Sequence, residues 1–265
     1  MARRALSTAS IGWSSSITFA TLGTAITTLV LVPGLNVLFT VLLGADLAAN
    51  DTVRIGCATA LIATLSSVAA GIVARVATDR WIGVFEYVCT ARPVDAGYWL
   101  GAAAVPALLA SVTGLSNVGI VWLLSLTAPS TGAASGLLIG AIALMPVAVL
   151  GGVCLGIFAA GLGLYLSDPY TGSNFLSIIL PVSAGVIVPV STYPGWLAWL
   201  CSWVPGSRLV QALDTSGSIA SSTTPNLFAL LATDTALAAL YAAIGLGLTF
   251  LAARRIRAGA RASLL

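Results

Sequence analysis

The stretch LLIGAIALMPVAVLGGVCLGIFAAGLGLYL fills residues 137–166 and contains no charged side chain. A bilayer core of about 30 Å needs about 20 apolar residues in a helix, so this stretch is long enough to cross a membrane. The whole chain has the same character, because 58% of its 265 residues are hydrophobic and 7% are charged, against roughly 25% charged residues in soluble domains. The sequence therefore predicts an all-α polytopic membrane protein with a single transmembrane domain over residues 1–265.

Five further apolar runs lie on either side of this stretch. The six predicted spans are residues 22–43, 55–74, 98–126, 137–166, 175–190 and 227–253. The third and fourth exceed what one straight crossing needs, so they should tilt or bend at Pro106 and Pro146. The fifth is short and holds Pro181 and Pro189, which predicts a break or a re-entrant segment after it.

All eleven basic residues are arginine, and their placement predicts the orientation. With a cytoplasmic N-terminus, nine arginines fall on the cytoplasmic side and two, Arg54 and Arg208, on the outside. Positive charge accumulates in the cytoplasmic loops of membrane proteins, so both termini are expected in the cytoplasm. Arginine without lysine, together with abundant alanine and glycine, favours a GC-rich bacterial genome and hence the inner (cytoplasmic) membrane.

The absence of lysine and histidine excludes several chemistries. Without lysine there is no phosphate-binding P-loop and no Schiff base, and without histidine there is no imidazole catalysis. The four cysteines have no C-x-x-C spacing and are interpreted as small apolar residues. We expect no catalytic residue, metal site or cofactor in this chain. From the orientation, Cys89 is expected to be accessible from the cytoplasm and Cys201 from outside.

A charged segment, TDRWIGVFEYVCTARP at residues 78–93, follows the second predicted span. Ile82, Phe85 and Val88 recur at helical spacing between charged residues, which predicts a short amphipathic helix at the membrane surface. A merely solvated loop is the alternative, but such a loop would not need three aromatic residues. A surface helix that docks a cytoplasmic partner accounts for both features.

A tryptophan-rich segment at residues 192–214 separates the last two predicted spans. Trp196, Trp199 and Trp203 follow the i, i+3, i+7 spacing of one helix face. Tryptophan favours the membrane interface. Two interpretations stay open, namely a simple aromatic-belt helix and an outer lid over an exit path.

Small and weakly polar residues mark the predicted helix surfaces. Glycines every four positions, as at Gly152 and Gly156, let helices approach closely, either within the bundle or at a dimer seam. Hydroxyl and amide side chains on the first two spans usually bond within their own helix or to a neighbour, and the alternative is that they line a substrate cavity. The candidates for that cavity are Thr28, Asn36, Ser66 and Ser67.

The cytoplasmic segment resembles the coupling region of the type-2 ABC exporter permeases. That family has an acidic residue, a glycine four residues later, an apolar pair with a glutamate, and a proline before the third span. Asp79, Gly83, Val84-Phe85, Glu86 and Pro93 stand at the corresponding places. The resemblance implies the following ATPase-coupling residues: Asp79, Gly83, Phe85, Glu86 and Arg92.

The tryptophan-rich segment is similar to the outer re-entrant elements of the same family. The resemblance implies an outer gate at Pro189, Pro194, Trp196, Trp199 and Trp203. The family usually has an amphipathic helix before its first span. Only about 20 residues, rich in serine and threonine, are available for it here, so that helix is expected to be short or less polar.

The resemblance also implies partners and a mechanism. The complex would hold two permease chains, either two copies or a copy and a paralogue, and two ABC ATPase subunits that bind ATP and Mg²⁺. It would contact membrane lipids and no nucleic acid. The helix around residues 83–91 would transmit closure of the ATPases, and alternating access would export a hydrophobic or amphipathic small molecule, lipid or peptide, as in multidrug resistance. The chain would not be an enzyme by itself.

Other functions stay open, namely a lipid-linked glycan exporter, a proton-coupled secondary carrier and a non-transporting scaffold. A carrier would need an acidic residue at the membrane midplane. Asp234 precedes Arg254 by 20 residues, about 30 Å along a helix. If Arg254 marks the inner face, Asp234 is expected at the outer interface and not at the midplane.

Overall fold

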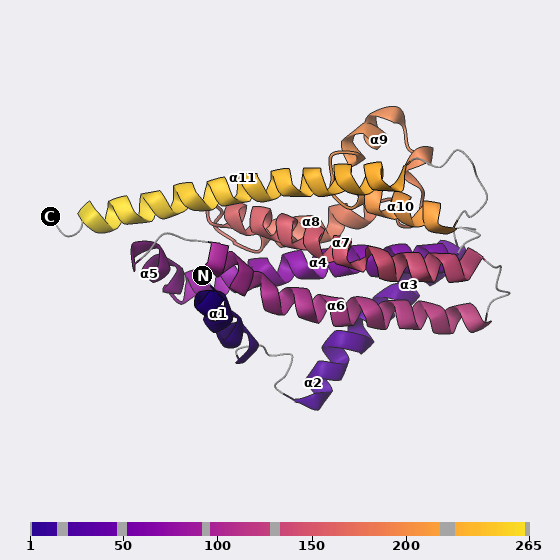
Figure 1. The fold of residues 1–265 in the computed structure, drawn as a ribbon, viewed down its shortest axis with the longest axis horizontal. Helices are drawn as coiled ribbons and strands as arrows, with labels where there is room; N and C mark the ends of the chain where they lie inside the picture. Colours follow the sequence, from indigo (N-terminus) through magenta and orange to yellow (C-terminus); the bar gives the residue numbers. More distant parts are fainter. Residues whose placement is uncertain are drawn as a thin grey trace.

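A computed structural model describes residues 2–14, 21–46, 52–91, 96–127, 133–217 and 226–262. All regular structure in these residues is helical, as the sequence predicts. Long helices lie side by side as a bundle with shorter helices at its ends (Figure 1). In chain order the elements are α1 (Ala2–Ser14), α2 (Leu22–Ile26), η2 (Thr27–Leu31), α3 (Val32–Asp46), α4 (Thr52–Trp81), α5 (Val84–Ala91), α6 (Ala96–Thr127), α7 (Ala133–Gly163), α8 (Thr171–Ser183), η3 (Val190–Thr192), α9 (Gly195–Cys201), α10 (Ser207–Gly217) and α11 (Leu227–Ala262).

Five helical segments of the described chain are long and apolar enough to cross a membrane. They are Leu22–Asp46, Thr52–Trp81, Ala96–Leu126, Ala134–Gly163 and Leu227–Gly259. Each corresponds to one predicted span, but α4 and α11 run several residues further than expected. Pro106 and Pro146 lie inside continuous helices. The chain therefore has the helical architecture of a membrane protein, with five candidate spans among the described residues.

The first candidate span contains a turn of π-helix. This turn, η2, lies between α2 and α3 and ends two residues before Pro33. Proline has no N–H to donate, and its ring crowds the carbonyl four residues earlier. The helix widens at this point and continues to Asp46.

The predicted fifth span, residues 175–190, is interrupted. α8 has 13 residues, about 20 Å at the helical rise per residue, which is too short for a bilayer core of about 30 Å. It stops at Gly185, whose φ of +68° is easily adopted only by glycine. The Gly185 N–H donates to the Val182 carbonyl at 3.1 Å, and the Val186 N–H donates to the Pro181 carbonyl at 3.2 Å. Pro181 lies inside the helix. The predicted break is therefore present, but it lies at Gly185 and not at Pro181.

α4 is the central helix, packed against α3, α6, α7 and α8. α7 comes close to it at two glycines. A Cβ atom at Gly152 would lie 2.5 Å from the Leu65 carbonyl oxygen, and one at Gly156 would lie 3.0 Å from the Ala69 Cα. This glycine pair therefore serves packing within the bundle.

A short helix precedes the first candidate span, as expected from the length available. This helix, α1, packs against α6, and a Cβ atom at Gly12 would lie 3.5 Å from Val105. Ile11 and Trp13 are exposed. α1 thus presents exposed apolar side chains beside the bundle.

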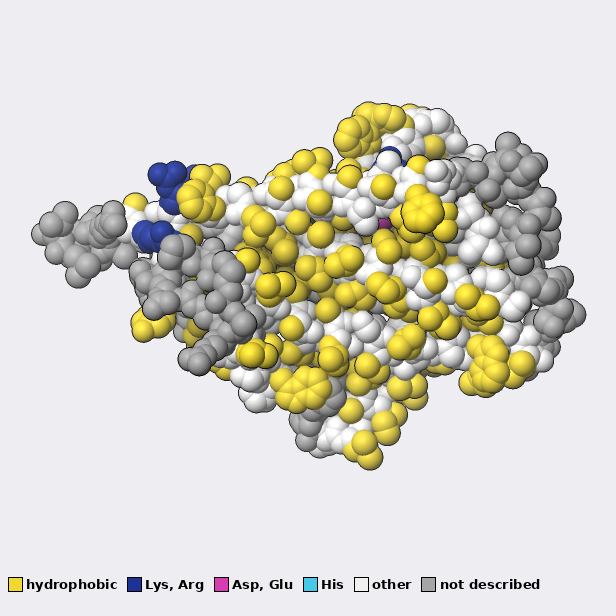
Figure 2. Space-filling view, in the orientation of Figure 1, with side chains coloured by type: hydrophobic (Ala, Val, Ile, Leu, Met, Phe, Trp, Pro, Cys, Tyr) yellow, Lys and Arg dark blue, Asp and Glu magenta, His cyan; other side chains and the backbone are white. Residues whose placement is uncertain are grey.

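The two ends of the bundle carry different elements. α5 and the C-terminal part of α11 lie at one end, and α9 and α10 lie at the other (Figure 1). Apolar side chains cover the visible face between these ends, and basic side chains gather over the C-terminal part of α11 (Figure 2). The described arginines also lie at the two ends of the bundle: Arg54 and Arg208 lie at the α10 end, and the others lie at the α5 end.

Candidate functional site

The segment predicted to be an amphipathic helix contains a short helix, α5, which a tight turn separates from α4. α4 ends at Trp81, and Gly83 adopts a φ of +80°, a conformation that other residues adopt at a cost. The Gly83 N–H donates to the Arg80 carbonyl at 3.2 Å, and its own carbonyl accepts from the Tyr87 N–H at 3.2 Å. The amphipathic helix therefore begins directly after this glycine.

One face of α5 is locked into the bundle. Phe85 is 1% exposed and belongs to a buried cluster with Cys89 and with Tyr98 of α6. The Phe85 and Tyr98 rings meet edge to face, with centroids 6.3 Å apart. From α11, Arg257 Nε donates to the Cys89 carbonyl oxygen at 2.7 Å. Side chains of α4, α6 and α11 thus hold α5 in place.

Asp79 belongs to the last turns of α4 and is 4% exposed. Its Oδ2 accepts a hydrogen bond from the Tyr98 hydroxyl at 2.9 Å, and its Oδ1 lies 3.4 Å from Arg75 Nη2. The resemblance implies that Asp79 and Phe85 are ATPase-coupling residues. The structure buries both of them, so they contact the bundle and position α5 from behind. Arg92 and Pro93 lie outside the described residues.

The opposite face of α5 and its turn is open. Trp81 is 93% exposed, Tyr87 is 74% exposed and Ile82 is exposed as well. A Cβ atom at Gly83 would meet nothing within 4 Å, and Glu86, three residues later, is exposed. We call these five residues the α5 face: Trp81, Ile82, Gly83, Glu86 and Tyr87.

Arg80 ties the same end of α4 to α7. Its Nη1 donates to the carbonyl oxygens of Gly163 at 2.8 Å and Leu166 at 3.0 Å. These carbonyls lie at and just beyond the C-terminus of α7, where unpaired acceptors and the negative end of the helix dipole favour a cation. A movement of α4 at this end would therefore be passed to α7.

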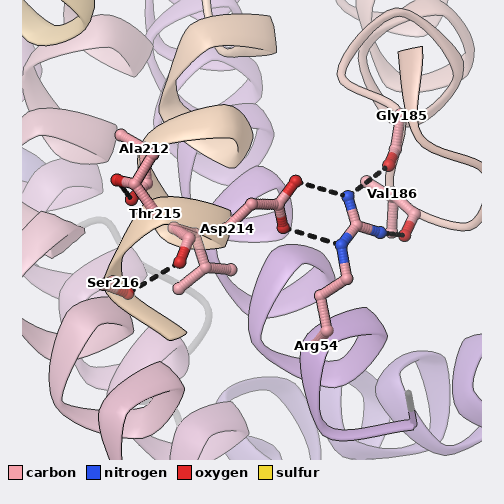
Figure 3. A network of polar contacts seen from close by, with 8 residues as sticks. Arg54, Gly185, Val186, Ala212, Asp214, Thr215 and Ser216 are labelled. Atoms are coloured by element: carbon pink, nitrogen blue, oxygen red, sulfur yellow. Dashed lines mark hydrogen bonds and ion pairs between the residues drawn. The ribbon is translucent and has the colours of Figure 1, made fainter. Parts of the chain in front are cut away.

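At the other end, Arg54 connects three segments (Figure 3). Its Nε and Nη2 form a two-point ion pair with the Asp214 carboxylate at 2.7 and 3.0 Å. Its Nη1 donates to the Val186 carbonyl at 3.1 Å, and Nη2 also donates to the Gly185 carbonyl at 3.3 Å. One guanidinium thus links α4, the turn after α8 and α10.

Asp234 of α11 holds the other end of α10. It is 3% exposed, and its two carboxylate oxygens accept from the Gly206 N–H at 3.0 and 3.2 Å. A carboxylate at a helix N-terminus is stabilised by the unpaired N–H groups and the helix dipole. Asp234 lies at the bundle end that carries α10, where its distance from Arg254 along the sequence predicts it.

The three tryptophans of the tryptophan-rich segment at residues 192–214 do not lie on one helix. α9 ends at Cys201, so Trp203 lies in the turn after it, and the predicted helix through Trp203 is wrong. Trp196, Trp199 and Trp203 are all exposed, and the last two meet edge to face with centroids 6.1 Å apart. The two prolines assigned to the outer gate immediately precede the short helices η3 and α9; they are Pro189 and Pro194.

The cysteines correct another expectation. Cys89 and Cys201 are both buried, although the orientation argument predicts that each is accessible from one side. Burial raises the pKa of the Cys89 thiol, against a smaller lowering by Arg257, and burial also raises the pKa of Cys201. Both thiols are therefore poorly placed to react with a soluble reagent.

The proposed cavity residues mostly bond within their own helices. Thr28 Oγ1 donates to the Thr24 carbonyl at 2.7 Å, and Ser66 Oγ donates to the Ala63 carbonyl at 3.1 Å. Asn36 and Ser67 are exposed on α3 and α4. Sequence reasoning did not identify Asn117, which is fully buried in α6 with no hydrogen-bond partner for its amide atoms among the described residues.

No protein-family model matches the chain, and comparison with curated proteins gives no match.

Proposed function

We propose that this chain is the membrane-spanning permease subunit of an ATP-driven exporter of the type-2 ABC class. The observation that carries the proposal is α5. It is a short helix beyond the end of a central span, with one face bound to three spans and an aromatic face open. A helix that only covered the bundle would not need exposed Trp81 and Tyr87.

The contacts of α5 support a route for force from a partner into the bundle. A push on the α5 face acts on Phe85 and Cys89, which pack against α6, and on the Cys89 carbonyl, which Arg257 of α11 holds. Through the turn at Gly83 it acts directly on α4, which Arg80 ties to α7. A partner that moves on ATP binding would therefore shift four candidate spans together.

The α10 end supports an outer gate in the same proposal. α8, α9 and α10 form a unit between α7 and α11 that does not cross the bundle as one helix. Arg54 and Asp234 fasten α10 at its two ends. A gate needs such fixed points, because the segment between them can then move without leaving the bundle. The long helices supply few polar groups that could bind a cargo. A hydrophobic or amphipathic molecule is therefore the cargo that fits this bundle best.

A proton-coupled carrier has less support. The eight acidic residues of the chain are few, and the three inside candidate spans, Asp46, Asp79 and Asp234, all lie toward the ends of their helices. Asp234 is bound to the Gly206 N–H. That carboxylate serves α10 and does not stand free at the midplane. A lipid-linked glycan exporter would share the coupling helix and stays the alternative within the class.

The α5 face provides the test. We expect Glu86→Arg to remove an ATPase partner from the purified complex and to abolish ATP-dependent efflux from cells, while expression and membrane insertion stay normal. A reversed charge in a partner pocket costs several kcal/mol, whereas on a free surface it costs within about 0.5 kcal/mol. Gly83→Trp should act in the same way by steric exclusion.

Gly259→Arg is the matched control. Gly259 is exposed on α11 at the same bundle end, and a Cβ atom there would meet nothing within 4 Å. This variant adds positive charge without touching the α5 face, so it should retain partner and efflux. Normal partner recovery and normal efflux in Glu86→Arg would contradict the proposal.

A further inference from the structure

We propose that the groove between α6, α7 and α11 at the α5 end holds the acyl chain of an anionic phospholipid, with Arg257 binding its headgroup. The groove has a volume of about 470 Å³, within the range of about 300–1,000 Å³ typical of small-molecule sites. Arg257 also holds α5 in the proposed export function, but lipid binding is tested here by its own measurement, without an ATPase partner.

The lining of the groove is that of an amphiphile site. Trp99 and Leu100 of α6, Ile157 of α7, and Leu246 and Phe250 of α11 make its walls apolar. Arg257 is the charged residue of the lining. Its Nε is used by the Cys89 carbonyl, while its Nη atoms form no hydrogen bond within the described chain. A cation at one end of an apolar groove matches a ligand with a negative head and a hydrocarbon tail.

The dimensions match one leaflet of a bilayer. Leu246 precedes Arg257 by eleven residues, about 16 Å along the helix axis. Half of a bilayer core is about 15 Å. With Arg257 at the interface, Leu246 therefore lies near the midplane, and the groove runs over the depth that one acyl chain occupies. In the orientation that the arginines predict, this is the inner leaflet.

A lipid suits this groove better than a protein segment. Leu100, Leu246 and Phe250 are exposed on helices of membrane-spanning length, so hydrocarbon is what surrounds the opening. A protein segment at this depth would need its own backbone groups satisfied. A lipid tail has none to satisfy, and its headgroup reaches Arg257, the charged residue of the lining.

Native mass spectrometry of the purified full chain, with dipalmitoyl phosphatidylglycerol or dipalmitoyl phosphatidylcholine added, tests the headgroup. We expect the wild type to retain phosphatidylglycerol about fivefold better, the factor for one arginine near an anionic headgroup. Arg257→Gln should lose this preference. Arg257→Lys should keep it, because it keeps the positive charge.

Arg255→Gln is the matched control, because Arg255 lies on the same helix but stacks over Tyr165, away from the groove. It should keep the preference. Leu246→Trp should reduce retention of dipalmitoyl phosphatidylglycerol several-fold and leave the dihexanoyl form unaffected, because only the long chain reaches the deep end.

Several results would overturn the proposal. They are equal retention of both headgroups by the wild type, equal losses in Arg255→Gln and Arg257→Gln, and binding of inorganic phosphate in place of lipid. A change of oligomeric state in Leu246→Trp with unchanged lipid retention would assign the groove to a second copy of the chain.

Discussion

At the scale of single residues, four of the few charged side chains bind backbone groups at or near helix ends. Arg80 donates to carbonyls at the end of α7, Arg257 to one in α5, and Arg54 to two in the turn after α8. Asp234 accepts from an N–H at the start of α10. Helix ends leave unpaired backbone groups, and away from water a charged side chain is an effective partner for them.

Asn117 differs from these residues because it is a buried polar side chain without a hydrogen-bond partner among the described residues. An unsatisfied buried polar group costs about 1–3 kcal/mol. We expect Asn117→Leu, which has a similar volume, to raise the thermal unfolding temperature in detergent, followed by tryptophan fluorescence.

Thr64→Val is the control for this prediction. Thr64 is fully buried on α4, and its hydroxyl donates to the Ala60 carbonyl at 2.7 Å. Its replacement should bring no gain, because no unsatisfied group is removed. A lower unfolding temperature for Asn117→Leu would show that the amide is satisfied in the membrane-embedded protein.

At the scale of elements, α5 and α10 are short helices fastened to the long ones by side chains distant in sequence. α5 depends on Tyr98 and Arg257 for its position. α10 depends on Arg54 at its C-terminal part and on Asp234 before its first turn. Helices of this length are marginal in isolation, so these contacts decide where they lie.

The Arg54–Asp214 pair can be tested in α10 itself. We expect Asp214→Asn to speed backbone hydrogen exchange in α10 by roughly tenfold or more, because charge-assisted hydrogen bonds are worth about 1.5–3 kcal/mol. Exchange measured by mass spectrometry in nanodiscs would show the effect. Arg54→Gln should produce the same pattern.

Asp46→Asn is the matched control for the pair. Asp46 is exposed at the end of α3, at the same end of the bundle, and its loss removes an equal charge. Exchange in α10 should stay at the wild-type rate in this variant. If Asp214→Asn and Asp46→Asn gave equal rates, the pair would not hold α10.

At the scale of the whole molecule, the two ends of the bundle differ, because one presents an open face of exposed side chains and the other carries a group of short helices. The α5 face lies at the first, and α9 with α10 lies at the second. Long helices connect the two, and α4 reaches from the Arg54 contacts to the Arg80 contacts. A motion at the α5 face thus has a continuous helix along which to reach α10.

The proposed function requires an energy source outside the chain. The chain has no lysine, so it cannot form a phosphate-binding P-loop. We expect the purified chain alone in nanodiscs to release phosphate from ATP no faster than empty nanodiscs. Faster release is expected only after an ATPase partner is added. Hydrolysis by the lone chain, after removal of contaminating ATPases, would contradict this expectation.

Hydropathy and local spacing determined much of the fold. The 30-residue run at 137–166 and its counterparts predict long helices, because burial in lipid depends on each segment's own composition. The spacing of Ile82, Phe85 and Val88 predicts α5 for the same local reason. The position of Asp234 near a helix end follows from the rise of a helix.

Only the tertiary structure decided which residues of the predicted coupling segment are exposed and which are buried. Asp79 and Phe85 turn inward because Tyr98 lies opposite them, and no local pattern contains that neighbour. Arg54 finds its partner 160 residues away, and Arg257 finds Cys89 168 residues away. Such pairings depend on how the long helices pack, which is set by close approaches such as Gly152 against α4. Periodicity within one helix carries no information on which other helix will lie beside it.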